Sequence, residues 1–65
     1  MPQASDEDRA KMASWNAKMI IQLAGLRLDE ADDRIIALAE RCADRFYYLD
    51  LAASELIHIL SRERT

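Results

Sequence analysis

Residues that form tight turns are almost missing from this chain, which has one glycine, Gly25, and one proline, Pro2, among 65 residues. Hairpin turns between strands depend on Gly, Pro and Asn, and strands favour alternating β-branched and aromatic residues. Helix-favouring Ala, Leu, Glu, Arg and Met are abundant here instead. The sequence therefore predicts an all-α protein with long helices and few turns.

Three local signals place the helices. Ser5 precedes three acidic residues, which suits an N-cap hydroxyl followed by carboxylates at the positive end of a helix. Gly25 is a C-terminal stop signal, and Asp29 is a second N-cap candidate. We predict an antiparallel helical hairpin, in one domain covering residues 6–62 after a flexible N-terminus at 1–5, with a helix at about 6–26, a turn at about 25–29 and a helix at about 30–61. A break between Tyr48 and Asp50 would give three helices instead.

The second predicted helix is apolar on more than one side. Its main apolar face alternates small and large side chains every seven residues, an arrangement typical of antiparallel bundles; the face includes Ala39, Phe46, Ala53 and Leu60. Beyond Asp44 the opposite side is apolar as well, which indicates a second contact surface. This candidate partner-binding surface, either a dimer contact or a docking site for another protein, consists of Tyr48, Leu51, Ala52 and Ile59, with Tyr47 beside it.

The first predicted helix also carries two apolar stripes, one with large side chains and one rich in alanine. A hairpin of two helices covers only one stripe, so we expect a second copy of the chain to cover the other. Small side chains allow close approach of helix axes, and the candidates for close helix packing or dimer contact are Ala13, Ala17, Ile20 and Ala24. A homodimer that forms a four-helix bundle would satisfy both helices.

Composition argues against several other classes of protein. Cys42 is the single cysteine, so no intrachain disulfide and no Cys-based zinc site is expected. No catalytic, cofactor-binding or metal-binding set of residues stands out, and we expect a non-enzymatic protein. The N-terminus lacks the pattern of a secretory signal and no apolar run is long enough to cross a membrane, so a cytoplasmic protein is expected. A formal net charge of −3 disfavours nucleic acid as a partner.

The acidic turn and helix start LDEADDRIIALAERCADRFY, at 28–47, resembles the Rop family of plasmid-copy-number proteins. That resemblance implies a homodimeric four-helix bundle that binds paired RNA loops. It also implies that the RNA contacts would come from a polar strip on the first helix, formed by Lys11, Lys18 and Gln22.

These observations favour a small regulatory or adaptor protein, of bacterial or phage type, that binds another protein through helical surfaces. An inhibitor, an anti-activator, a chaperone-like protein and a phage-encoded modulator all fit this class. A Rop-like, homodimeric RNA-binding regulator is the alternative. An enzyme is the least favoured class, because 65 residues offer neither a closed pocket nor a convergent set of reactive side chains.

Overall fold

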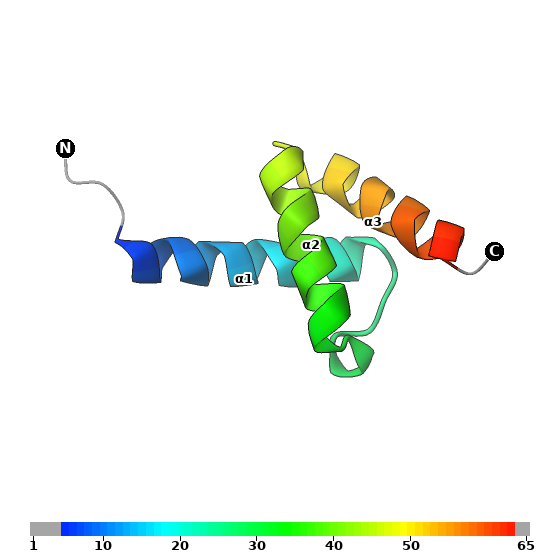
Figure 1. Ribbon diagram of the computed structural model, residues 1–65, viewed down its shortest axis with the longest axis horizontal. Helices are drawn as coiled ribbons and strands as arrows, with labels where there is room; N and C mark the ends of the chain where they lie inside the picture. Colours follow the sequence, from blue (N-terminus) through cyan, green and yellow to red (C-terminus); the bar gives the residue numbers. More distant parts are fainter. Residues whose placement is uncertain (1–4, 64–65) are drawn as a thin grey trace.

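The computed structural model describes residues 5–63, and within this range the chain is all-helical. The α-helices are α1 (Asp6–Leu23), α2 (Asp33–Arg45) and α3 (Leu49–Glu63), with a short 3-10 helix, η1 (Leu28–Glu30), between α1 and α2. Figure 1 shows α1 along the longest axis of the molecule, with α2 crossing it and α3 folding back beside α2. The predicted all-α class is confirmed, and within residues 5–63 the second predicted helix is divided into α2 and α3. The flexible terminus predicted at 1–5 lies, except for Ser5, outside the described residues.

Capping interactions set both ends of α1. The Ser5 hydroxyl oxygen accepts a hydrogen bond from the Asp8 amide at 3.1 Å, as predicted for an N-cap. At the other end the Gly25 amide donates to the Gln22 carbonyl at 3.0 Å and the Leu26 amide donates to the Ile21 carbonyl at 3.1 Å. This is a Schellman motif, and it requires the left-handed φ of +80° that Gly25 adopts. The helix therefore ends at Leu23, slightly earlier than the predicted 26.

The start of α2 differs from the prediction because a different aspartate caps it. The Oδ1 atom of Asp32 accepts from the Ile35 amide at 2.9 Å, so Asp32 is the N-cap. Asp29, the predicted cap, instead accepts from the Arg27 guanidinium at 2.8 Å within η1. Several acidic residues in this segment can cap a helix, and Ala31 has extended backbone angles that prevent an earlier start. The connection after α1 is therefore longer than the predicted turn at 25–29.

The predicted continuous helix at about 30–61 is also wrong, since it breaks between α2 and α3. Phe46 takes extended backbone angles, φ −118° and ψ 128°, although its amide still donates to the Cys42 carbonyl. Helical bonding resumes where the Ala52 amide donates to the Tyr48 carbonyl at 3.0 Å. A straight helix would point much of its apolar surface into water, whereas the break lets both halves pack on α1. The three-helix alternative noted from the sequence is the one adopted.

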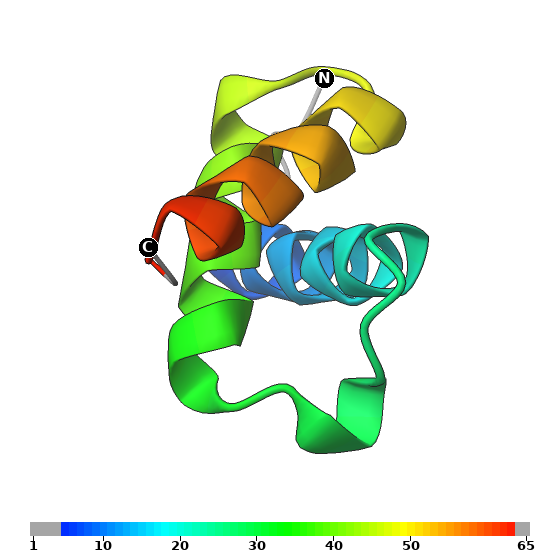
Figure 2. The ribbon, with the colours of Figure 1, turned by 90° about the vertical axis from the view of Figure 1, so that its right-hand side faces the viewer.

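The core lies where the three helices meet, and it is thin. Figure 2 shows α3 crossing above α1, with α2 alongside both. The fully buried large side chains are Ile20, Ile21 and Leu56, and the other buried residues are small. Those small residues allow close packing of the helices; they are Ala17, Ala39, Cys42, Ala52 and Ala53. An exposed ion pair between Arg34 and Glu63 joins the first turn of α2 to the last turn of α3. No helix within residues 5–63 is long and apolar enough to span a membrane.

Candidate protein-binding surfaces

The junction between α2 and α3 displays two exposed tyrosines. Tyr47 is 91% exposed and Tyr48 is 62% exposed, and their rings meet edge to face at 5.1 Å between centroids. Leu51, in the first turn of α3, is also exposed. We call Tyr47, Tyr48 and Leu51 the tyrosine patch. Because the helix breaks here, neither tyrosine belongs to the core or packs against it.

Two residues predicted to share this surface lie elsewhere. Ala52 is fully buried in the three-helix core, so it cannot contact a partner directly. Ile59 is half-buried and lines a groove between α2 and α3. The prediction treated this segment as one straight helix with a single far side, but α3 packs on both α1 and α2 and turns these two residues inward.

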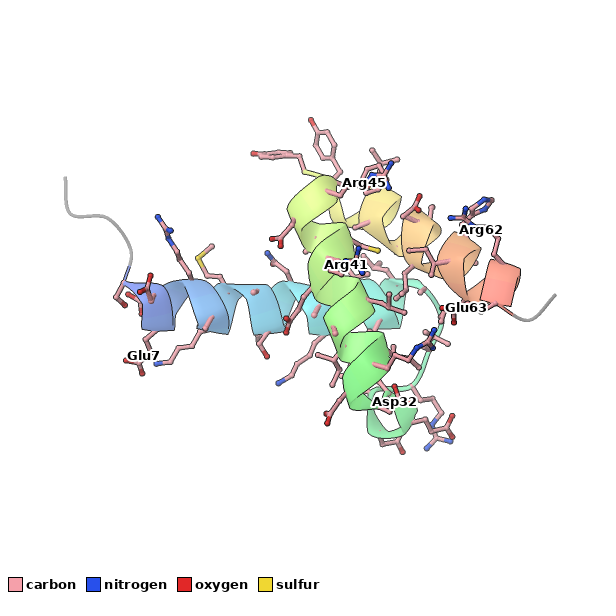
Figure 3. The ribbon with its side chains drawn as sticks, viewed as in Figure 1. Glu7, Asp32, Arg41, Arg45, Arg62 and Glu63 are labelled. Atoms are coloured by element: carbon pink, nitrogen blue, oxygen red, sulfur yellow. The ribbon has the colours of Figure 1, made fainter. Side chains whose placement is uncertain are left out.

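The groove between α2 and α3 has an apolar floor and a charged rim. Its volume is about 590 Å³ and it is open to solvent. We call it the α2–α3 groove. Arg41 and Arg45 stand one helical turn apart on its rim, as Figure 3 shows. The remaining lining residues are Leu38, Cys42, Asp44, Glu55 and Ile59.

The single thiol on the α2–α3 groove, Cys42, has a raised pKa. Burial raises the pKa of the Cys42 thiol, and the nearby Glu55 carboxylate raises this pKa further. Arg45 and Arg41 oppose this effect with smaller contributions. A thiol with a raised pKa is a poor nucleophile at neutral pH. Cys42 is thus an inert, buried residue on the floor of the groove. At the rim, the Arg62 guanidinium lies 3.7 Å from the Glu55 carboxylate.

The two apolar stripes predicted on α1 have different surroundings. Ala17 and Ile20, two of the close-packing candidates, are fully buried against α2 and α3 of the same chain, and Ala13 and Ala24 are half-buried. The close contacts of this stripe are therefore made within one chain. On the other stripe Met12, Trp15 and Leu23 are exposed, whereas Met19 and Leu26 are half-buried and Leu26 packs against the core. We call Met12, Trp15 and Leu23 the α1 stripe.

The polar strip implied by the Rop resemblance is also accessible. Lys11, Lys18 and Gln22 are all exposed on α1, and the Lys11 ammonium lies 3.5 Å from the Glu7 carboxylate. The three-helix arrangement nevertheless differs from the two-helix hairpin that the resemblance implied. The strip thus stands on a different scaffold from the one expected.

Comparison of the chain with protein families, curated proteins and solved structures gives no match. Within residues 5–63, no group of three or more His, Cys, Asp and Glu side chains is placed to hold a metal ion. Three surfaces thus stand out within residues 5–63: the tyrosine patch, the α2–α3 groove and the α1 stripe. The sequence predicted every residue of the first, indicated the third only as a stripe of large apolar side chains, and gave no sign of the second.

Proposed function

We propose that this chain is a small regulatory or adaptor protein that binds another protein through the tyrosine patch. The observation that carries the proposal is the pair of adjacent tyrosines, 91% and 62% exposed, that the core does not use. Tyrosine is enriched among the residues that contribute most to protein interfaces, because its ring buries large area at little entropic cost. Two such rings beside an exposed leucine form an anchor of this kind.

The charges beside the tyrosine patch indicate the chemistry of the partner. Asp44 and Asp50 flank the tyrosines in the chain and are both exposed, and the exposed Arg45 is the one basic residue between them. The Asp50 carboxylate accepts a hydrogen bond from the Leu51 amide at 3.0 Å, which holds it at the start of α3. A protein surface with an apolar pocket for a tyrosine ring and basic side chains around it would complement this arrangement.

Homodimer formation is the second part of the proposal. A chain of 65 residues buries only about 60% of its surface on folding, and small domains commonly gain stability by association. The thin core and the exposed α1 stripe support this expectation. The bundle originally expected from two hairpins is replaced here by an association of two three-helix units.

Affinity copurification with a paired stability measurement tests the docking proposal. The variant Tyr47→Ser/Tyr48→Ser should keep its helical circular dichroism and its melting temperature, because both rings lie outside the core. It should lose the partner protein that the wild-type chain retains from its native host. A matched control, Ser61→Ala, changes an exposed residue at the other end of α3 and should retain that partner.

Nuclease treatment separates protein binding from the RNA-binding alternative. Retention of the partner after nuclease treatment supports the proposal. The RNA-binding alternative predicts a different result. Capture would then be lost on nuclease treatment and on neutralisation of Lys11 and Lys18, but it would survive loss of the tyrosines. That result would contradict the proposed protein docking and support RNA binding through the polar strip.

A further inference from the structure

The N-terminal half of α1 stands clear of the other helices. Residues 5–12 are all exposed, and Figure 1 shows this part of α1 extending beyond the region where α2 and α3 pack. The molecule is consequently elongated, with extents of 46 × 23 × 16 Å. A helix that is isolated in water gains little stability from its own hydrogen bonds, since most helical stability in proteins comes from packing of an amphipathic face.

One side of α1, from its projecting end to the middle of the helix at Trp15, is amphipathic. Asp8, Met12 and Trp15 are spaced i, i+4 and i+7, so they lie along one side of the helix. Met12 is 61% exposed and Trp15 is 67% exposed. This side therefore presents a carboxylate followed by two large apolar groups, a spacing used by helices that bind in grooves.

The α2–α3 groove presents the complementary chemistry. Its floor contains Leu38 and Ile59, and its rim carries the Arg41 and Arg45 guanidinium groups. The Arg45 guanidinium lies 5.5 Å from the Phe46 ring centroid, while Arg41 makes no ion pair with any residue from 5 to 63. Two cations one turn apart repel each other unless an anion binds between them. Asp44 and Glu55 also line the groove, and Glu55 lies 3.7 Å from Arg62. The apolar floor suits Trp and Met side chains, and Arg41 offers a carboxylate a cation that has no ion-pair partner within residues 5–63.

We propose that the projecting half of α1 docks into the α2–α3 groove of a second copy, with Asp8 near Arg41 and Arg45 and with Trp15 on the apolar floor. This inference rests on the proposed homodimer and names its interface. The acidic end of α1 points away from the groove of its own chain, because Glu7 lies near one end of the molecule and Arg41 and Arg45 lie on α2, nearer its middle (Figure 3). Reciprocal docking around a two-fold axis closes the assembly at two copies.

Complementation between two variants tests this interface. Met12→Ser/Trp15→Ser disables the helix and leaves the groove intact, whereas Arg41→Glu/Arg45→Glu disables the groove and leaves the helix intact. All four of these side chains are exposed, so both variants should keep wild-type circular dichroism. By sedimentation equilibrium, each variant alone should dimerise with a Kd at least about 30-fold above wild type, the effect expected of an interface anchor.

An equimolar mixture of the two variants gives the decisive result. One intact helix and one intact groove remain in each mixed pair, so the mixture should associate at least about tenfold more tightly than either variant alone. A matched control, Leu51→Ser, alters the tyrosine patch and should leave the dimer unchanged. If the charge-reversed variant unfolds, Arg41→Gln/Arg45→Gln replaces it in the same design.

Each other outcome overturns a distinct part of the reasoning. Wild-type dimerisation of both variants would exclude the helix-in-groove interface while leaving the homodimer in place. If Met12→Ser/Trp15→Ser loses the dimer and mixing with the groove variant does not restore it, the α1 stripes of the two copies contact each other. That result also excludes the groove as the interface. A wild-type chain that stays monomeric at micromolar concentration would overturn the homodimer itself, and docking of another protein at the tyrosine patch would remain separately testable.

Discussion

Leu56→Ala is the substitution that most directly probes the three-helix core. Leu56 is fully buried, and it is the only large side chain that α3 contributes to the fully buried set of residues 5–63. Replacing a buried leucine by alanine costs about 2–5 kcal/mol, the sum of lost transfer free energy and the cavity that remains. A chain of this length has a total stability of about 3–10 kcal/mol, at about 0.05–0.15 kcal/mol per residue. We therefore expect this one change to remove a large part of the stability, or all of it.

Urea unfolding followed by circular dichroism measures the effect. The matched control is Leu51→Ala, which removes the same atoms from an exposed position on the same helix and should change the free energy of unfolding by less than about 0.5 kcal/mol. Both variants should be compared at one protein concentration, because a dimer's apparent stability depends on concentration. Equal free energies of unfolding for Leu56→Ala and Leu51→Ala would refute the packing of α3 described above.

Substitutions at three further positions test other parts of the fold. Ala17→Leu should overpack the junction of the helices and lower the free energy of unfolding by about 1–3 kcal/mol in chemical denaturation, since Ala17 is fully buried. Gly25→Ala should lower the free energy of unfolding by about 1–2 kcal/mol in the same assay, through backbone strain at φ +80°. No atom lies within 4 Å of the added Cβ, so a steric clash adds nothing to this cost. Gly25→Asn should cost less, because asparagine tolerates this conformation better. The Arg34 guanidinium holds the pKa of the Glu63 carboxyl below its ordinary value, so this pair stabilises the fold above the ordinary glutamate pKa and the contribution disappears as pH falls through the lowered one. Glu63→Gln should therefore reduce the loss of melting temperature on acidification.

Local signals in the sequence predicted the ends of α1 well, because caps and stops depend on a few adjacent residues. Ser5 caps the helix and Gly25 terminates it through backbone geometry that only nearby atoms determine. The start of α2 was mispredicted because the segment offers several acidic caps, and the selection of Asp32 over Asp29 depends on how η1 and Arg27 fold around them.

The break after α2 illustrates what local signals omit. No glycine or proline marks Phe46 to Tyr48, and the seven-residue repeat continues across it, so a continuous helix satisfies every local rule. Folding α3 back onto α1 and α2 buries apolar side chains, and this stabilisation comes from tertiary packing. The sequence signals it only by the change from a charged to an apolar far side of the helix after Asp44. From sequence alone, that change is equally consistent with a surface that a partner chain covers.

The candidate surfaces were predicted in part for the same reason. Tyr47, Tyr48 and Leu51 are exposed because they lie at the break and in the first turn of α3. Ala52 was misplaced because its position depends on the direction of α3. The α2–α3 groove could not be found from the sequence, since its lining comes from two helices whose relative placement only the tertiary fold determines.

The central claim is that the tyrosine patch binds another protein. A photo-crosslinking residue at position 48 tests this claim most directly. The chain carrying this residue in place of Tyr48 is expressed in its native host and irradiated, with the same residue in place of the exposed Ser61 as the control. We predict that position 48 crosslinks to a discrete foreign polypeptide and that position 61 does not. Crosslinks from position 48 only to a second copy of the chain, or to no protein at all, would contradict the account.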